Sequence, residues 1–345
     1  MGGELGVNRF TYELPPSRIA ERPIKPADAA KFLCISKSSG KIDHRVFSEL
    51  DGLVRRGDIF VLNETKVQPA RLFGTTATGA DIEVLIVTRN RKRAVCMARP
   101  LKRFKEGGRI TFQGDIIATV GKREGDFGVE LFFELDDPIL SEKLERAGSM
   151  PIPPYIRDGI ADEADLVDYQ TIFANVPGSI TAPTASLHFT PQLMQRMIDA
   201  GAVFERLVLH LGVASFRPID GGQPPAPEQL IISDEQISRL QQYKKEGRRI
   251  IAVGTSATRA LESALRPEVK KSSSGGVFTE LFIQPGFDFQ FVDGLITNFH
   301  QPDTTHLLLV EALLGRRNIE RSYEAALGNG YRFLSYGDAM FVVPE

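Results

Sequence analysis

Three of the five histidines in this chain stand close to small hydroxyl or amide residues, in stretches far apart in the sequence. His188 lies in APTASLHFT, His210 in LHLGVASF and His300 in ITNFHQP. An imidazole titrates near neutral pH, so each could give or take a proton while nearby polar groups orient a substrate. They are candidate acids or bases, although a histidine in an apolar run is more often a satisfied core residue.

The stretch from Gly178 to Phe216 predicts a loop, a helix and a strand. Thr190 followed by Pro191 is typical of a helix N-cap and first helical position, and Gly201 is placed to end the helix. The following apolar strand brings three candidate site residues to its carboxyl end, the edge at which open α/β sheets bind ligands. These residues are His210, Gly212 and Ser215.

Ahead of that helix, the loop before Thr190 offers backbone amides and hydroxyls near a helix N-terminus. The partial positive charge of the aligned peptides favours an anionic or polar ligand group there. The candidate binding residues of this loop are Pro183, Thr184 and Ser186.

Polar residues also follow three other predicted strands. Asn63 and Thr65 come after the strand at 58–62, where they could equally make a turn. Gly254, Thr255 and Ser256 form a predicted strand-to-helix turn, which matches neither a Walker sequence nor GxGxxG and is weak support for nucleotide binding. The last strand leads to Asn298 and His300, before a helix that we expect Asp303 or Thr304 to cap.

Between residues 71 and 135 the apolar periodicity changes to two, with about six short strands separated by turn residues. This pattern predicts a small antiparallel β-barrel. Strands and helices alternate on both sides of it, so we expect an α/β main domain (residues 1–65 plus 151–345) interrupted by the inserted barrel (residues 66–150).

Composition excludes several classes of protein. The 345 residues carry a formal net charge of −2 and only two cysteines, which stand in no metal-binding spacing and form no disulfide framework. No signal peptide is evident, and no apolar run approaches the roughly 20 residues that span a bilayer. We therefore expect a cytoplasmic protein with no metal and no membrane contact.

A basic segment from Arg89 to Arg109 contains nine Lys or Arg residues and one acidic residue. Such a run is either a set of solvated hairpin tips or a surface that contacts the phosphates of a nucleic acid. The candidate phosphate-contacting residues are Arg91, Lys92, Arg93, Lys102 and Arg103.

Collinear motifs along nearly the whole chain resemble one family, the queuosine-pathway S-adenosylmethionine:tRNA ribosyltransferase-isomerases. The motifs include YELPPSRIAERP, LNETKVQPARLFG, APTASLHFT, LHLGVASF, VGTSATRALES, DGLITNFHQP and SYGDAM. The resemblance implies a monomeric cytoplasmic enzyme that uses S-adenosylmethionine as a ribosyl donor. Its acceptor would be 7-aminomethyl-7-deazaguanine at the wobble position of tRNAs with GUN anticodons, and its products epoxyqueuosine-tRNA, adenine and methionine.

The implied mechanism begins when a base removes a proton from the 5′ carbon beside the sulfonium. Adenine then leaves, the acceptor amine adds, and closure of the epoxide expels methionine. His188, His210 and His300 are the candidate catalytic residues within the matched motifs. The candidate substrate-binding residues are Asn63, Thr65, Arg71, Pro183, Thr184, Ser186, Gly212, Ser215, Glu228, Gly254, Thr255, Ser256 and Asn298.

The chain departs from the family pattern after LHLGVASF. The family has a histidine-rich EHxMHxE segment there, whereas this chain has GGQPPAPEQLIIS, in which only Glu228 matches. Asp303 also replaces a lysine of the family pattern. Two alternatives therefore stay open: a divergent paralogue that cleaves S-adenosylmethionine with a non-tRNA acceptor, and a non-catalytic RNA-binding module.

Overall fold

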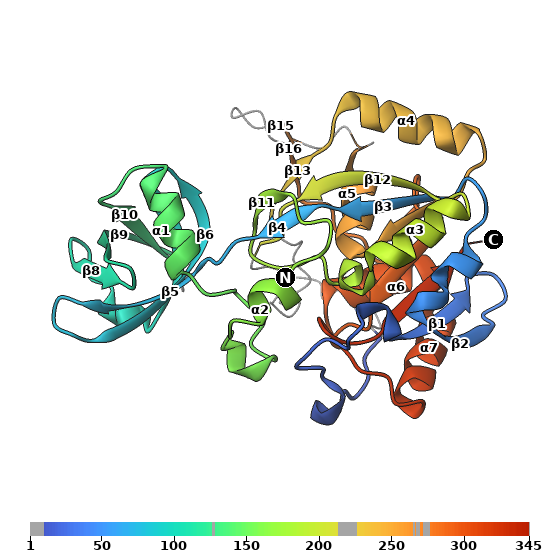
Figure 1. The fold of residues 1–345 in the computed structure, drawn as a ribbon, viewed down its shortest axis with the longest axis horizontal. Helices are drawn as coiled ribbons and strands as arrows, with labels where there is room; N and C mark the ends of the chain where they lie inside the picture. Colours follow the sequence, from blue (N-terminus) through green and yellow to red (C-terminus); the bar gives the residue numbers. More distant parts are fainter. Residues whose placement is uncertain are drawn as a thin grey trace, which may run out of the picture. The chain divides into compact units, whose positions relative to one another are not determined.

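A computed structural model describes residues 10–125, 128–212, 226–264, 266, 270–271 and 277–344. The chain forms two compact units (Figure 1). The main unit contains Met1–Lys66, Gln170–Val176 and Ala182–Glu345, and the barrel unit contains Val67–Tyr169 and Pro177–Thr181. Strands β4 (Thr65–Val67) and β11 (Val176–Ser179) lie where the chain passes between the units.

The barrel unit contains a closed six-stranded antiparallel barrel with the strand order β10-β7-β6-β5-β8-β9. Residues such as Leu72, Ile82 and Val84 point inward because alternate side chains of a strand face the same side. Leu140 and Leu144 of the following helix complete this core. The elements are β5 (Arg71–Thr76), β6 (Asp81–Asn90), β7 (Arg93–Arg99), β8 (Arg109–Phe112), β9 (Ile116–Glu124), β10 (Gly128–Phe133), α1 (Ile139–Ala147) and α2 (Asp165–Asp168).

The main unit is built on a ten-stranded sheet with the order β15-β16-β13-β12-β3-β14-β17-β18-β1-β2. Its centre consists of four neighbouring parallel strands, β12, β3, β14 and β17, whose carboxyl ends therefore share one edge. The strands are β1 (Lys31–Ser36), β2 (Ile42–Val46), β3 (Ile59–Asn63), β12 (Val203–Leu209), β13 (Glu228–Ile231), β14 (Ile250–Val253), β15 (Lys270–Lys271), β16 (Val277–Thr279), β17 (Gly294–Asn298) and β18 (Ala339–Val343). An α/β unit interrupted by an antiparallel barrel confirms the expected fold class.

Helices of the main unit begin where the sequence places their caps. Thr190 Oγ1 accepts a hydrogen bond from Leu193 N at 3.1 Å, and Pro191 is the first helical residue. Thr304, and not Asp303, caps the helix after β17, because its side chain accepts from Leu307 N. The helices are α3 (Pro191–Asp199), α4 (Asp234–Lys245), α5 (Thr255–Ala264), α6 (Thr305–Leu314) and α7 (Arg316–Gly328).

One local expectation differs from the structure. The segment Thr184–His188, expected as an open loop, is a 3₁₀ helix (η6) packed into the core, closed by the Ser186 N to Pro183 O bond at 2.9 Å. Lys270–Lys271 form β15 and pair with β16. Strand β16 ends at Thr279, whose hydroxyl accepts a hydrogen bond from Leu281 N at 3.1 Å.

Candidate functional site

A residue of the predicted site stands at the carboxyl end of each of the four central parallel strands. Asn63 ends β3, His210 follows β12, Gly254 follows β14 and Asn298 ends β17. Because the strands are parallel and adjacent, these residues come to one edge of the sheet. Gly254 also lies against η6, since a Cβ added there would meet the Ala185 Cβ at 3.6 Å. The sheet topology thus brings four of the predicted site residues, Asn63, His210, Gly254 and Asn298, to one edge.

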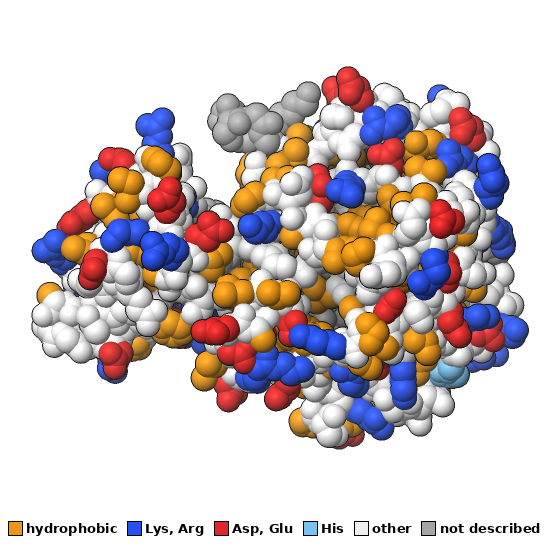
Figure 2. Space-filling view, viewed as in Figure 1, with side chains coloured by type: hydrophobic (Ala, Val, Ile, Leu, Met, Phe, Trp, Pro, Cys, Tyr) orange, Lys and Arg blue, Asp and Glu red, His pale blue; other side chains and the backbone are white. Residues whose placement is uncertain are grey.

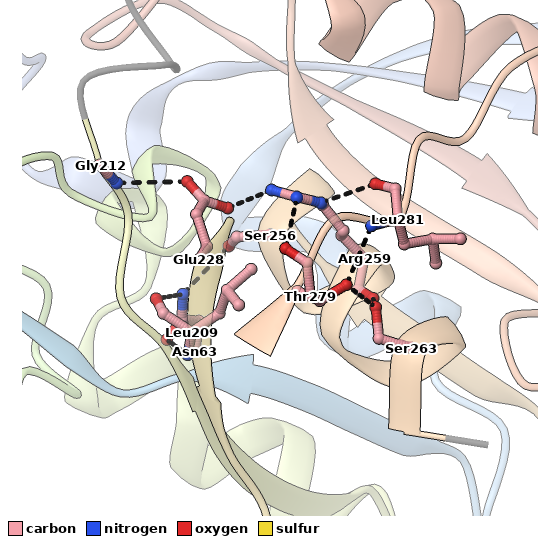
Figure 3. A network of polar contacts seen from close by, with 9 residues as sticks. All are labelled: Asn63, Leu209, Gly212, Glu228, Ser256, Arg259, Ser263, Thr279 and Leu281. Atoms are coloured by element: carbon pink, nitrogen blue, oxygen red, sulfur yellow. Dashed lines mark hydrogen bonds and ion pairs between the residues drawn. The ribbon is translucent and has the colours of Figure 1, made fainter. Parts of the chain in front are cut away.

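Asn63 connects β3 with β12 and α5 (Figure 3). Its Nδ2 donates to Leu209 O at 2.9 Å and to Ser256 Oγ at 3.2 Å, and its Oδ1 accepts from Leu209 N at 3.1 Å and Thr65 N at 3.2 Å. The side chain is 0% exposed. Since these protein groups use both ends of the amide, the arrangement favours a positioning role over the substrate contact that we expected.

His210 is the half-buried histidine of β12's carboxyl end. Its Nδ1 is hydrogen-bonded to Thr65 Oγ1 at 2.9 Å, so Thr65 sets the orientation of the ring. Burial lowers the pKa of His210. The imidazole is therefore mostly neutral at pH 7, the state that can accept a proton.

A buried ion pair joins Glu228 Oε2 and Arg259 beside Gly212 (Figure 3). The other carboxylate oxygen, Glu228 Oε1, accepts from Gly212 N at 3.2 Å. Arg259 Nε donates to Leu281 O at 2.8 Å, and Nη2 donates to Thr279 O at 3.0 Å. Burial raises the pKa of Glu228, and the Arg259 charge opposes that rise. Glu228 thus fixes the backbone at Gly212.

His188 is buried in the core, next to the end of β17. Its Nε2 lies 3.3 Å from Asn298 Oδ1, and its ring packs against Phe47 with centroids 5.0 Å apart. Asn298 Nδ2 donates to Leu334 O at 2.9 Å and Ser335 O at 3.2 Å, which leaves Oδ1 as the group facing His188. Burial lowers the pKa of His188 to about 4. This geometry is typical of a structural histidine.

His300 is half-buried and is held at both its ring and its backbone. Its ring Nε2 is hydrogen-bonded to Thr297 Oγ1 at 2.8 Å, and its backbone N–H donates to Tyr323 OH at 3.0 Å. The Tyr12 hydroxyl donates to its carbonyl. Burial and the neighbouring His306 hold the pKa of His300 well below its usual value, so the ring is neutral at pH 7.

His306, in the first turn of α6, was not among the residues that the motifs selected. Its ring stacks on that of His300, with centroids 5.3 Å apart and planes 19° apart. Burial and the charge of Arg259 lower the pKa of His306 to about 4. No residue in the described part of the chain makes a hydrogen bond to its ring nitrogens. His306 could have been selected from the sequence, because it stands in the first turn of a predicted helix that follows a polar loop at a strand end.

The remaining predicted residues have different surroundings. Arg71 lies in the barrel unit, where Nε is 3.0 Å from Glu83 Oε1 and Nη1 donates to Gly159 O. Ser186 is 0% exposed, and its Oγ has no hydrogen-bond partner among the described residues. Thr255 is the first residue of α5. Pro183 and Thr184 begin η6. Ser215 lies outside the described residues.

Four of the nine basic residues in the segment Arg89–Arg109 pair with acidic side chains that lie in β10 or just after it. Arg89 pairs with Asp137 at 2.9 Å and Lys92 with Asp136 at 2.9 Å, while Arg93 pairs with Glu130 and Arg109 with Glu134. Figure 2 shows basic and acidic side chains interspersed on one face of the barrel unit. Among the described residues of this segment, Arg91, Arg99, Lys102, Arg103 and Lys105 are exposed and have no acidic partner, and Arg103 Nη1 donates to Asp81 O. Counting charges within residues 89–109 could not reveal these ion pairs, because the acidic partners come later in the sequence.

A family model described as queuosine biosynthesis protein matches residues 7–342. The chain belongs to this family. The match confirms the resemblance that the collinear motifs indicated, and it spans both the main unit and the barrel unit.

Relatives of the family align over almost their entire length. Three proteins named S-adenosylmethionine:tRNA ribosyltransferase-isomerase are similar to this chain. The one from Desulfitobacterium hafniense is 39% identical (97% of this chain, 98% of the relative), that from Thermotoga maritima 38% (98% and 99%), and that from Staphylococcus haemolyticus 40% (98% and 100%). A crystal structure of S-adenosylmethionine tRNA ribosyltransferase from Thermotoga maritima matches with a TM-score of 0.54 and 32% identity, covering 96% of this chain and 99% of that one.

Two further observations concern the described residues only. They contain no group of three or more His, Cys, Asp or Glu side chains arranged to hold a metal ion. None of their helices combines the length and the apolar composition needed to cross a membrane.

Acidification is expected to destabilise the main unit through His188. Its folded-state pKa of about 4 lies below the ordinary value of about 6.5, so the unfolded chain binds the proton first as the pH falls. The stability that the neutral ring contributes is present above pH ~6.5 and is lost as the pH falls through about 4, a change of about 3 kcal/mol. Urea unfolding of the wild type and of His188→Phe between pH 7 and pH 4 measures it. Equal pH dependence in both proteins would contradict the assignment.

Proposed function

We propose that this chain is an S-adenosylmethionine:tRNA ribosyltransferase-isomerase. It moves the ribosyl moiety of S-adenosylmethionine to 7-aminomethyl-7-deazaguanine at the tRNA wobble position, and it releases adenine and methionine. The observation that carries this proposal is collinearity: relatives with this name are 38–40% identical over 97–98% of the chain. By family membership, we extend the proposal to tRNAs with GUN anticodons and to a monomer that works in the cytoplasm.

The carboxyl edge of the central strands is the proposed site for S-adenosylmethionine. Two half-buried histidines, His210 and His300, stand there, and both are mostly neutral at pH 7 because burial lowers each pKa. A neutral imidazole is the state that can remove the proton from the 5′ carbon. We assign this role to His300, since its ring and both flanking peptides are fixed. A base that is already held in one orientation loses no conformational entropy when the reaction takes place, which lowers the activation free energy.

Glu228 supports the proposal in spite of the altered segment around it. It is the acidic residue that this segment shares with the family pattern, and it joins Gly212 N to Arg259 at the proposed site. Of the segment Gly221–Ser233, which lacks the family histidines, the structure describes residues 226–233. No contact in the described residues favours a non-tRNA acceptor or a non-catalytic RNA-binding module.

Adenine release tests the function directly. Purified protein is incubated with S-adenosylmethionine alone, with tRNA carrying 7-aminomethyl-7-deazaguanine, with tRNA carrying guanine at that position, and with the free modified base. We expect adenine and an epoxide-containing tRNA nucleoside only with the modified tRNA. Adenine release with the free base alone would show a non-tRNA acceptor. Salt-sensitive tRNA binding without adenine release in any mixture would show an RNA-binding module.

Arg91 and Lys102 are the basic residues that we propose to contact tRNA phosphates. Each phosphate contact contributes about one unit to the slope of log affinity against log salt, so Arg91→Ala with Lys102→Ala is expected to flatten that slope by about 1–2 units. Salt titrations of tRNA binding measure the change. The matched control is Arg109→Ala, because Glu134 already pairs with that guanidinium at 3.1 Å. An unchanged slope in the double variant would contradict the contact.

A further inference from the structure

Two tyrosines from opposite ends of the chain hold the backbone of His300. His300 lies two residues beyond Asn298, the last residue of β17, so its own peptides are outside the sheet ladder. Its N–H donates to the hydroxyl of Tyr323, in α7, at 3.0 Å. Its carbonyl accepts from the hydroxyl of Tyr12, which is 288 positions earlier in the chain. Both peptides that flank the residue are therefore fixed.

The two tyrosines also contact each other. Their ring centroids lie 4.9 Å apart with planes at 60°, and Phe333 and Phe299 surround Tyr323. Tyr323 is buried, and Tyr12 is half-buried. Burial raises the pKa of both hydroxyls, so both stay protonated at neutral pH, and the Tyr12 hydroxyl keeps the proton that it donates to the His300 carbonyl. The pair is a rigid support, since each ring is packed by the other.

The ring of His300 is fixed separately from its backbone. Thr297 Oγ1 is hydrogen-bonded to Nε2 at 2.8 Å, and His306 stacks on one face. The side chain of His300 is half-exposed, so the hydrogen bonds to its two flanking peptides do not serve to bury it. They restrict the direction in which its imidazole can point. A displacement of about 1 Å at a reacting group can cost about a hundredfold in rate.

We propose that Tyr12 and Tyr323 are positioning residues that hold His300 in its reactive orientation. This inference rests on the proposed function, in which His300 is the base. It gives a role to the N-terminal YELPPSRIAERP motif, which supplies Tyr12 and which the ribosyl-transfer chemistry otherwise does not use. Tyr12 acts through its hydroxyl, because the aromatic ring alone cannot hold the carbonyl.

The same aromatic cluster contains a matched control. Tyr331 packs against Phe299 with centroids 5.6 Å apart, but its hydroxyl is hydrogen-bonded to His44 Nδ1 at 2.8 Å and does not contact His300. Tyr331→Phe and Tyr12→Phe therefore remove the same atom from neighbouring parts of one cluster. Of these two variants, only Tyr12→Phe removes a hydrogen bond to the backbone carbonyl of His300.

The experiment compares kcat and KM for adenine release, with melting temperature, in Tyr12→Phe, Tyr323→Phe and Tyr331→Phe. Loss of one hydrogen bond at the His300 backbone is expected to lower kcat about tenfold in Tyr12→Phe, with KM nearly unchanged. Tyr331→Phe should keep the kcat of the wild type. Tyr12→Phe added to His300→Ala should cause no further loss, because the group that it positions is gone.

NMR of the His300 imidazole supplies a readout that does not depend on turnover. Tyr12→Phe is expected to shift the ring resonances of His300, and Tyr331→Phe is expected to leave them in place. A folded Tyr12→Phe protein with the kcat and the His300 resonances of the wild type would overturn the inference. So would an equal loss of kcat with and without His300. If the wild type releases no adenine with any acceptor, the proposed function fails, and the resonances alone then decide whether Tyr12 orients His300.

Discussion

Replacing His300 by alanine is expected to lower the rate of adenine release by about a hundredfold or more, the range of general acid–base catalysis, with a modest change in KM for S-adenosylmethionine. The ring is neutral because its pKa lies well below the usual value, so it can accept a proton at pH 7. For the same reason, kcat of the wild type should stay level as the pH falls through 6.5 and decline only at lower pH. Steady-state kinetics on His300→Ala and a wild-type pH profile measure both effects.

His188→Ala is the matched control for His300→Ala. His188 also lies near the end of β17, but it is buried and faces Asn298 and Phe47. Its loss should lower the melting temperature and leave the turnover of the folded fraction nearly intact. His210→Ala tests the third candidate under the same conditions. Normal turnover in a folded His300→Ala protein would end the proposal that His300 is the base.

Replacing Arg259 by methionine is expected to destabilise the protein by about 3–5 kcal/mol, the cost of leaving one partner of a buried ion pair alone. The carboxylate of Glu228 is 5% exposed and would lose its guanidinium. The carbonyls of Leu281 and Thr279 would also lose their donors. Urea unfolding at pH 7 measures the change in the free energy of unfolding.

Two further variants separate the ion pair from other effects. Glu228→Gln combined with Arg259→Met removes both charges and should be less unstable than Arg259→Met alone, because no unpaired carboxylate remains. Arg239→Ala breaks the exposed pair with Glu205 and should have a much smaller effect. A single Arg259→Met variant as stable as Arg239→Ala would contradict the role of the buried pair.

Much of the fold follows from patterns that are local in the sequence. Thr190 and Pro191 begin α3 as the capping pattern predicts, because a cap depends on residues within one helical turn. The inward positions Ile82 and Val84 of the barrel follow from the period of two, since neighbouring side chains of a strand face opposite sides. The sequence also predicts Asn63 and Asn298 as polar residues at the ends of strands, because each follows an apolar run.

Only the tertiary structure decided which polar groups remain available for chemistry. Asn63 and His188 look like site residues in the sequence, but their partners are supplied by distant segments that meet at the sheet edge. Tyr12 reaches His300 only because the N-terminal segment packs beside α7. A sequence pattern reports neighbours within a few residues, whereas the burial, pKa and orientation of an imidazole depend on groups that the folded chain brings into contact.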